Sequence, residues 1–112
     1  MTEKGFAILK KATEINVSII DHIVVGKDAN IRDDFYNDIV DLAISYNIPF
    51  HKRGKHPAVN QGDYVFCVSW RWMIDHQPEK MIIFHDSILP KYRGFSPLVN
   101  MLINKESEIG VS

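Results

Sequence analysis

The residue best placed for acid–base chemistry is His85, which directly follows the apolar run Met81–Phe84. A continuous apolar run of this length predicts a buried strand. Open α/β sheets bind ligands at the carboxyl ends of their strands, and histidine is the side chain that takes up and releases protons near neutral pH. The sequence therefore predicts an acid–base group at the edge of a sheet.

A stiff, basic loop follows this histidine. Pro90 fixes the backbone as it leaves the strand, and Gly94 permits a tight turn or the close approach of a ligand. Between them stand Lys91, Tyr92 and Arg93. This basic and aromatic cluster could contact the phosphate groups of a substrate, or it could be a solvated turn, and three residues alone do not decide between these interpretations.

A second cluster, Ser69–Met73, follows the apolar run Tyr64–Val68. Its side chains Trp70, Trp72 and Met73 could line a pocket for a flat ligand, or the tryptophans could simply pack in the core. Both interpretations stay open at this point.

The other reactive side chains predict no site. The basic run His51–His56 lacks acidic or cysteine companions, so we expect a mobile surface loop and no metal site. His22 and His76 are isolated in the sequence and predict structural or exposed roles. Cys67 stands inside an apolar run, which predicts a buried, unreactive thiol.

Composition indicates a single domain with a real core. The chain has 112 residues, of which 46% are hydrophobic, and its formal net charge is −1, so no overall field favours nucleic acid. The single cysteine excludes an internal disulfide, and the chain has neither a signal peptide nor an apolar run long enough to span a membrane. These features predict a soluble, cytoplasmic protein with no membrane partner.

Helical and strand periodicities alternate along the chain. They predict a helix that begins at Thr2, a strand over Val17–Val25, a helix over Ile31–Tyr46 capped by Asp28 or Asn30 and ended by Asn47, a short strand at Ile48–Phe50, a loop over His51–Gly62, strands over Tyr64–Ser69 and Met81–His85, a helix over Pro97–Ile103 with Ser96 as N-cap, and the start of a strand at Ile109–Val111.

This alternation predicts an α/β fold, a Rossmann-like three-layer sandwich with a mostly parallel sheet. The sheet is expected to be incomplete at both ends, because the chain opens on a helix and stops where a further strand starts. The exposed edges of such a sheet would need a cover, and a homodimer is left open.

The run His85–Gly94 resembles the signature of the 10-formyltetrahydrofolate-dependent formyltransferases, in which His-x-Ser-Leu-Leu-Pro-x-x-x-Gly follows a central strand. Ile88 replaces the first leucine conservatively. The resemblance is close over the second half of the chain and loose over the first, and it implies that residues 1–112 form part of the N-terminal catalytic domain of that family.

The resemblance implies a role for each matching residue. His85 would be the catalytic histidine, Ser87 would help to fix the local turn, and the loop after the preceding strand would line the folate pteridine. The residues expected to bind the folate are Ser69, Trp70, Arg71, Trp72, Met73, Ser87, Leu89 and Pro90, and those expected to bind the amine acceptor are Lys91, Tyr92, Arg93 and Gly94. The co-substrate would be 10-formyltetrahydrofolate, with no metal.

Two positions depart from the family pattern. Ile83 stands where the family carries an asparagine that donates a hydrogen bond to the oxyanion, and isoleucine cannot donate one. The family's catalytic aspartate lies beyond the motif, after Ser112. Asp86 is adjacent to His85, but neighbouring strand residues point to opposite faces, so we do not expect it to replace that aspartate.

The implied function is the transfer of a formyl group to a primary amine, either of methionyl-tRNA or of an amino-sugar nucleotide, which would place the protein in one-carbon metabolism and, in the first case, protein biosynthesis. The alternative is a degenerate domain of the same fold that binds a ligand or assembles without catalysis. An unrelated nucleotide-binding α/β domain would need a glycine-rich phosphate loop after its first strand, and the sequence shows none.

Overall fold

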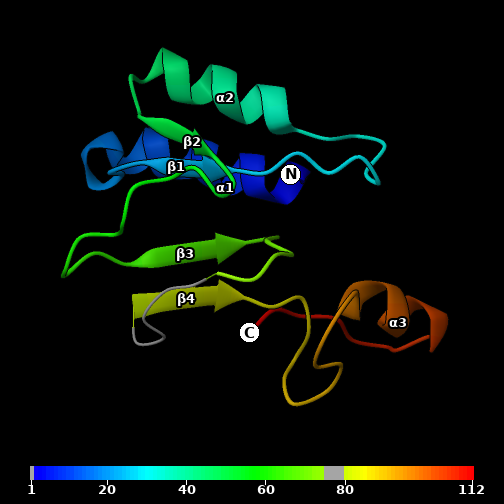
Figure 1. Ribbon diagram of the computed structural model, residues 1–112. Coiled ribbons are helices and arrows are strands. Elements are labelled where there is room, and N and C mark those ends of the chain that lie inside the picture. Colours follow the sequence, from blue (N-terminus) through cyan, green and yellow to red (C-terminus); the bar gives the residue numbers. More distant parts are fainter. Residues whose placement is uncertain (1, 75–79) are drawn as a thin grey trace.

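A computed structural model of the protein describes residues 2–74 and 80–112 (Figure 1), and His76 lies outside these described residues. Its elements in chain order are α1 (Glu3–Asn16), the 3₁₀ turn η1 (Val17–Ile19), β1 (Ile23–Val25), α2 (Tyr36–Ser45), β2 (Phe50–Lys52), β3 (Val65–Val68), β4 (Met81–Phe84) and α3 (Pro97–Ile103).

Four short strands form two parallel pairs, which confirms the predicted α/β class. Strand β1 pairs with β2, with Ile23 opposite Phe50, and β3 pairs with β4, with Val65 opposite Met81. The pairs are separate two-stranded sheets, and their arrows all point the same way in Figure 1. The carboxyl ends of all four strands therefore face the same side of the molecule.

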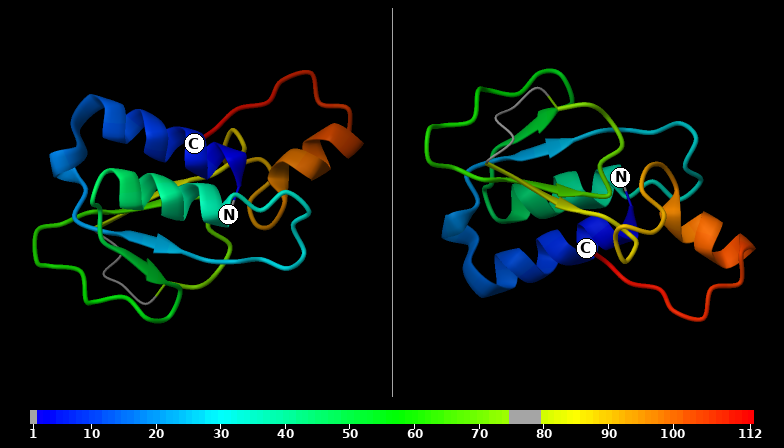
Figure 2. Two further views of the ribbon diagram at one scale, coloured as in Figure 1. Left: turned by 90° about the horizontal axis from the view of Figure 1, so that it is seen from above. Right: turned by 90° about the horizontal axis from the view of Figure 1, so that it is seen from below.

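The core lies where α1 and α2 pack together against β1 and β2. Val25 and Ile39 are its fully buried centre, because β1 and α2 present their apolar faces to each other. Figure 2 shows α1 and α2 side by side in both views, with α3 apart from them. The partly buried side chains around this centre are Phe6, Leu9, Ile23, Tyr36, Val40, Phe50 and Trp70.

The predicted first helix is confirmed, whereas the strand predicted from Val17 is too long. The Thr2 hydroxyl caps α1 by accepting from the Gly5 amide. After α1, the side-chain oxygen of Asn16 accepts hydrogen bonds from both the amide and the hydroxyl of Ser18, at 3.1 and 2.7 Å. These local bonds stabilise the turn η1 in place of extended backbone, so the strand begins only at Ile23.

Helix α2 begins five residues later than predicted because aspartates hold the preceding loop. The Asp28 side chain accepts from the Asn30 amide at 2.9 Å, and the Asp34 side chain accepts from the amides of Asp28 and Tyr36, both at 3.0 Å. These side chains bind backbone groups within the loop, and the N-cap position, Phe35, makes no side-chain capping bond. The helix therefore starts at Tyr36.

Two predicted boundaries shift along the chain. Strand β2 covers Phe50–Lys52 rather than Ile48–Phe50. The Ile48 amide donates to the Ala43 carbonyl of α2, and the residues in register with β1 are Phe50, His51 and Lys52. The first residues of the predicted loop His51–Gly62 are therefore strand.

Strands β3 and β4 are where predicted, but they are more exposed than a doubly covered strand would be. Ile83 is 61% exposed and Phe66 is also 61% exposed, because within the described residues no helix packs extensively over this pair. Cys67 is the buried exception, as predicted, and burial raises the pKa of its thiol.

Helix α3 spans the predicted residues, with Pro97 in its first turn. Ser96 holds the N-cap position, but its backbone is left-handed (φ 52°) and its side chain makes no capping bond. Ile109–Val111 is not a strand. Instead, Ser112 exchanges two backbone hydrogen bonds with His85, at 2.8 and 2.9 Å.

Within the described residues, no helix is both long and apolar enough to cross a membrane.

The core predicts a contrast between two isoleucines of α2. Ile39 is 1% exposed and Ile44 is 58% exposed. We expect Ile39→Ala to lower the free energy of unfolding by about 2–5 kcal/mol and Ile44→Ala to change it by no more than about 0.5 kcal/mol, measured by urea denaturation. Equal effects of the two substitutions would contradict this placement of the core.

Candidate functional site

The candidate site lies where the loops after β3 and β4 leave the sheet edge. The parallel pairing of these strands places Val68 beside Phe84, so the next residues of each strand, Ser69 and His85, emerge at the same edge. The two clusters singled out in the sequence are thus brought to one side of one sheet (Figure 1).

The His85 ring is half-buried and held by the loop that follows it. Its Nε2 lies 3.0 Å from the carbonyl oxygen of Tyr92. A carbonyl oxygen only accepts, so this bond places the proton on Nε2 and leaves the lone pair of the neutral ring on Nδ1. In this tautomer Nδ1 is the proton acceptor.

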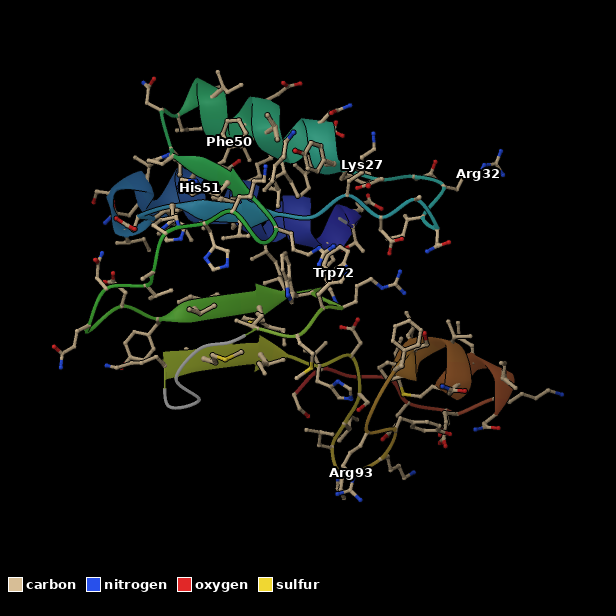
Figure 3. The ribbon with its side chains drawn as sticks, in the orientation of Figure 1. Lys27, Arg32, Phe50, His51, Trp72 and Arg93 are labelled. Carbon is tan, nitrogen blue, oxygen red and sulfur yellow. The ribbon has the colours of Figure 1, made fainter. Side chains whose placement is uncertain are left out.

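An open hollow of about 360 Å³ lies beside this ring. It is lined by Ile83, His85, Leu89, Arg93, Gly94 and Ser112. The structure thus brings together four predicted site residues, His85, Leu89, Arg93 and Gly94. Figure 3 shows Arg93 at the tip of the loop, directed away from the sheets.

Ser87 is at the centre of the turn after β4 and is fully buried. Its hydroxyl donates to the Lys91 carbonyl at 2.8 Å and its amide donates to the His85 carbonyl at 2.9 Å. Its own carbonyl accepts from the Ser112 hydroxyl at 2.9 Å. All of these bonds are internal to the protein, so Ser87 ties the loop together around His85. Pro90, whose bond to Leu89 is cis, is exposed on the far part of this loop.

The motif loop is also fastened to the segment after α3. The Tyr92 hydroxyl donates to Glu106 at 2.6 Å and accepts from the Asn104 side chain at 3.0 Å, and Lys91 lies 3.7 Å from Glu106. Sequence reasoning missed Glu106 and Asn104, because they lie outside the motif and their spacing from it carries no signal.

Asp86 points to a different partner from its neighbour. It pairs with Lys4 of α1. The Asp86 side chain thus contacts α1, whereas the His85 ring contacts the loop that follows β4.

The Ser69–Met73 loop divides between packing and exposure. Trp70 packs against the core, and its ring lies 4.9 Å from that of Trp72 in an edge-to-face arrangement. Met73 is 98% exposed. The indole Nε1 of Trp70 is buried and has no hydrogen-bond partner within the described residues, which is rare for a buried donor.

Arg71 connects three loops at the sheet edge. It pairs with Asp28 from the loop after β1, and its guanidinium lies 4.9 Å from the centre of the Phe95 ring in the loop before α3. The hydrogen bond from Arg71, with help from the Asn30 amide, lowers the pKa of the Asp28 carboxyl below its ordinary value of 3.8.

Trp72 links the loop after β3 to the ends of β1 and β2. Its ring lies against Gly26 and is covered by the Arg53 guanidinium, whose central carbon is 5.0 Å from the ring centre. Figure 3 shows Trp72 between the strand pairs. The basic run His51–His56 therefore includes a residue engaged in packing, which its sequence did not reveal.

His22, which is isolated in the sequence, has partners in the fold. Its Nδ1 lies 2.7 Å from the Asp21 carboxylate, and its ring lies 5.4 Å from that of His51. The two histidines meet because β1 and β2 pair in parallel, a contact that joins residues far apart in the sequence. Across the described parts of the chain, no group of three or more histidine, cysteine, aspartate or glutamate side chains is arranged to hold a metal ion.

The contact between Gly26 and Trp72 predicts that substitutions at these two positions have coupled effects on the free energy of unfolding. A Cβ at position 26 would lie 2.5 and 2.7 Å from two carbons of the Trp72 ring, so Gly26→Ala should lower the free energy of unfolding by roughly 1–3 kcal/mol. The same substitution in a Trp72→Leu background should cost much less. Urea denaturation of the four proteins measures this coupling, and equal costs in both backgrounds would show that the ring does not occupy this space.

The Asp28–Arg71 pair predicts a dependence of stability on acid. A carboxyl whose pKa is lowered in the folded protein stabilises it fully above the unfolded pKa, and this contribution is lost as pH falls through the folded value. We expect Asp28→Asn to be less stable than the parent at neutral pH and to lose less stability below pH 3.8. Thermal unfolding across pH measures this, with the exposed Asp41→Asn as control; a parallel pH profile for parent and Asp28→Asn would contradict it.

Comparison with known proteins shows similarity to a formyltransferase. The chain is 29% identical over 111 residues to a methionyl-tRNA formyltransferase of Finegoldia magna, a match that covers 95% of this chain and 28% of that protein. No family model matches the chain, and no solved structure matches it. The chain thus spans under a third of the length of the curated relative, and it resembles a formyltransferase over almost all of its own length.

Proposed function

We propose that the protein carrying this chain transfers a formyl group from 10-formyltetrahydrofolate to a primary amine in the cytoplasm, with His85 as the acid–base group. The observation that carries the proposal is the His85 ring, held by the Tyr92 carbonyl on the wall of an open hollow at a parallel sheet edge. The similarity to a methionyl-tRNA formyltransferase over 111 residues supports the same reaction class.

The Nε2–H tautomer of His85 determines which ring nitrogen would move the proton during formyl transfer. The amine attacks the formyl carbon, a new C–N bond forms and a tetrahedral oxyanion develops, after which the bond from carbon to the folate nitrogen breaks. The proton lost by the attacking nitrogen has to reach the departing nitrogen. Nδ1 of His85 would accept and return it, since Nε2 is already protonated and bound to Tyr92.

The loop after β3 would hold the folate. Met73 is exposed and Trp72 is partly exposed, and Ser69 and Arg71 belong to the same loop. The unpaired Nε1 of Trp70 is a buried donor that a polar group of a ligand would satisfy. Leu89 and Pro90 would form the apolar wall on the other side, while Ser87 would contribute by fixing the turn rather than by touching the ligand, because it is fully buried.

The acceptor would approach from the Lys91–Gly94 side. Arg93 and Gly94 line the hollow, and Lys91 and Arg93 are exposed cations that suit the phosphates of methionyl-tRNA or of an amino-sugar nucleotide. Tyr92 would act through its carbonyl. The relative's name favours methionyl-tRNA as the first acceptor to test.

A specific observation favours the alternative, a non-catalytic domain of the same fold. Ile83 lines the hollow and is 61% exposed, at the position where the family that the motif resembles carries an oxyanion donor. Loss of one oxyanion donor costs roughly 10²–10³ in turnover. Binding of a folate without turnover would support this alternative.

The deciding experiment uses the full-length protein with 10-formyltetrahydrofolate and either methionyl-tRNA or an amino-sugar nucleotide. We expect transfer to one acceptor, and His85→Ala should lower kcat by roughly 10²–10⁴. The exposed, distant Ile15→Ala serves as a control for general effects. Full turnover by His85→Ala would overturn the role of the histidine, and Ile83→Asn should raise kcat if the missing donor limits the reaction.

A further inference from the structure

His85 is linked through Tyr92 to Glu106, which lies in the segment after α3 and outside the motif. The His85 ring is bound by a backbone carbonyl. A backbone carbonyl has no side-chain rotation, so its position is set by the conformation of its loop. That carbonyl belongs to Tyr92, whose backbone is left-handed (φ 54°), a conformation that non-glycine residues rarely adopt. A contact from outside the turn would help to hold Tyr92 in this conformation.

The Tyr92 side chain shows what holds it. Its hydroxyl donates a short hydrogen bond of 2.6 Å to a carboxylate oxygen of Glu106, and the side-chain amide of Asn104 donates to the same hydroxyl at 3.0 Å. The other carboxylate oxygen of Glu106 lies 3.7 Å from the Lys91 ammonium. Glu106 is half-buried and contacts two consecutive residues of the turn, Lys91 and Tyr92. It lies 14 residues after Tyr92 in the chain.

We propose that Glu106 is a positioning residue that sets the tautomer of His85 through Tyr92. By fixing the hydroxyl of Tyr92, Glu106 keeps the carbonyl of the same residue opposite Nε2, so that the proton rests on Nε2 and Nδ1 stays available as the proton acceptor. The catalytic consequence rests on the proposed function, whereas the control of the tautomer does not.

The tautomer can be measured directly, without any activity. The ¹⁵N shifts and couplings of imidazole nitrogens distinguish the Nε2–H from the Nδ1–H form, and the His85 signals of the full-length, ¹⁵N-histidine-labelled protein can be assigned by their loss in His85→Gln. We expect His85 of the parent protein to be in the Nε2–H form. Tyr92→Phe and Glu106→Ala should each convert it to a mixture of both forms.

Two further variants separate positioning from general damage. Glu106→Gln keeps an oxygen that can accept from the Tyr92 hydroxyl and should preserve the Nε2–H form, even though the ion pair with Lys91 is lost. Glu108→Ala removes a nearby carboxylate that makes no hydrogen bond or ion pair within residues 2–74 and 80–112, and it should leave the spectrum unchanged. Tyr92→Phe removes one oxygen atom only, so it tests the contact if Glu106→Ala fails to fold.

We expect the turnover number of each variant to fall in step with its loss of the Nε2–H form. Glu106→Ala and Tyr92→Phe should lower kcat more than they change KM, by less than the roughly 10²–10⁴-fold loss expected without the His85 ring, and Glu106→Gln should recover most of it. An Nδ1–H form in the parent, or an unchanged His85 signal in Tyr92→Phe, would overturn the inference. A shifted tautomer in a protein that transfers no formyl group would instead retain the inference and reject the proposed function.

Discussion

The parallel pairing of β3 with β4 is the constraint on which the candidate site depends. Since residues opposite each other in parallel strands leave the sheet at the same edge, the pairing of Val68 with Phe84 determines that the loop beginning at Ser69 and the loop beginning at His85 emerge together. Without this register, the aromatic loop and the histidine motif would be two unrelated features of the chain. With it, they leave the same sheet edge, where Arg71 and Trp72 also contact the loops that follow β1 and β2.

The turn around His85 is built almost entirely from internal hydrogen bonds. Ser87 is fully buried and bonds the carbonyl of Lys91, Ser112 pairs with the backbone of His85, and Tyr92 is held at both its carbonyl and its hydroxyl. A loop so thoroughly satisfied has few alternative conformations at low free energy. Its outer residues are different, since Leu89, Arg93 and Gly94 are exposed and line the hollow, so a rigid base carries an accessible rim.

The sequence was informative wherever one physical signal dominated. The capping hydroxyl of Thr2, the apolar run at Met81–Phe84 and the proline of Pro97–Ile103 each predicted an element that the structure contains. It failed where side chains compete with the regular backbone: Asn16 and Ser18 convert a β-branched stretch into a 3₁₀ turn, and Asp34 delays α2. The motif identified His85, but contacts across the fold, such as Tyr92 with Glu106 or His22 with His51, leave no trace in local spacing.

The solitary buried thiol at Cys67 gives this fold a natural reporter. The Cys67 side chain is buried in β3, which pairs with β4, the strand that precedes His85. Burial raises the pKa of the thiol, so little of it is present as the reactive thiolate. Alkylating reagents can therefore modify it only when that pair of strands opens, so the rate of labelling measures how often the scaffold beneath the candidate site comes apart.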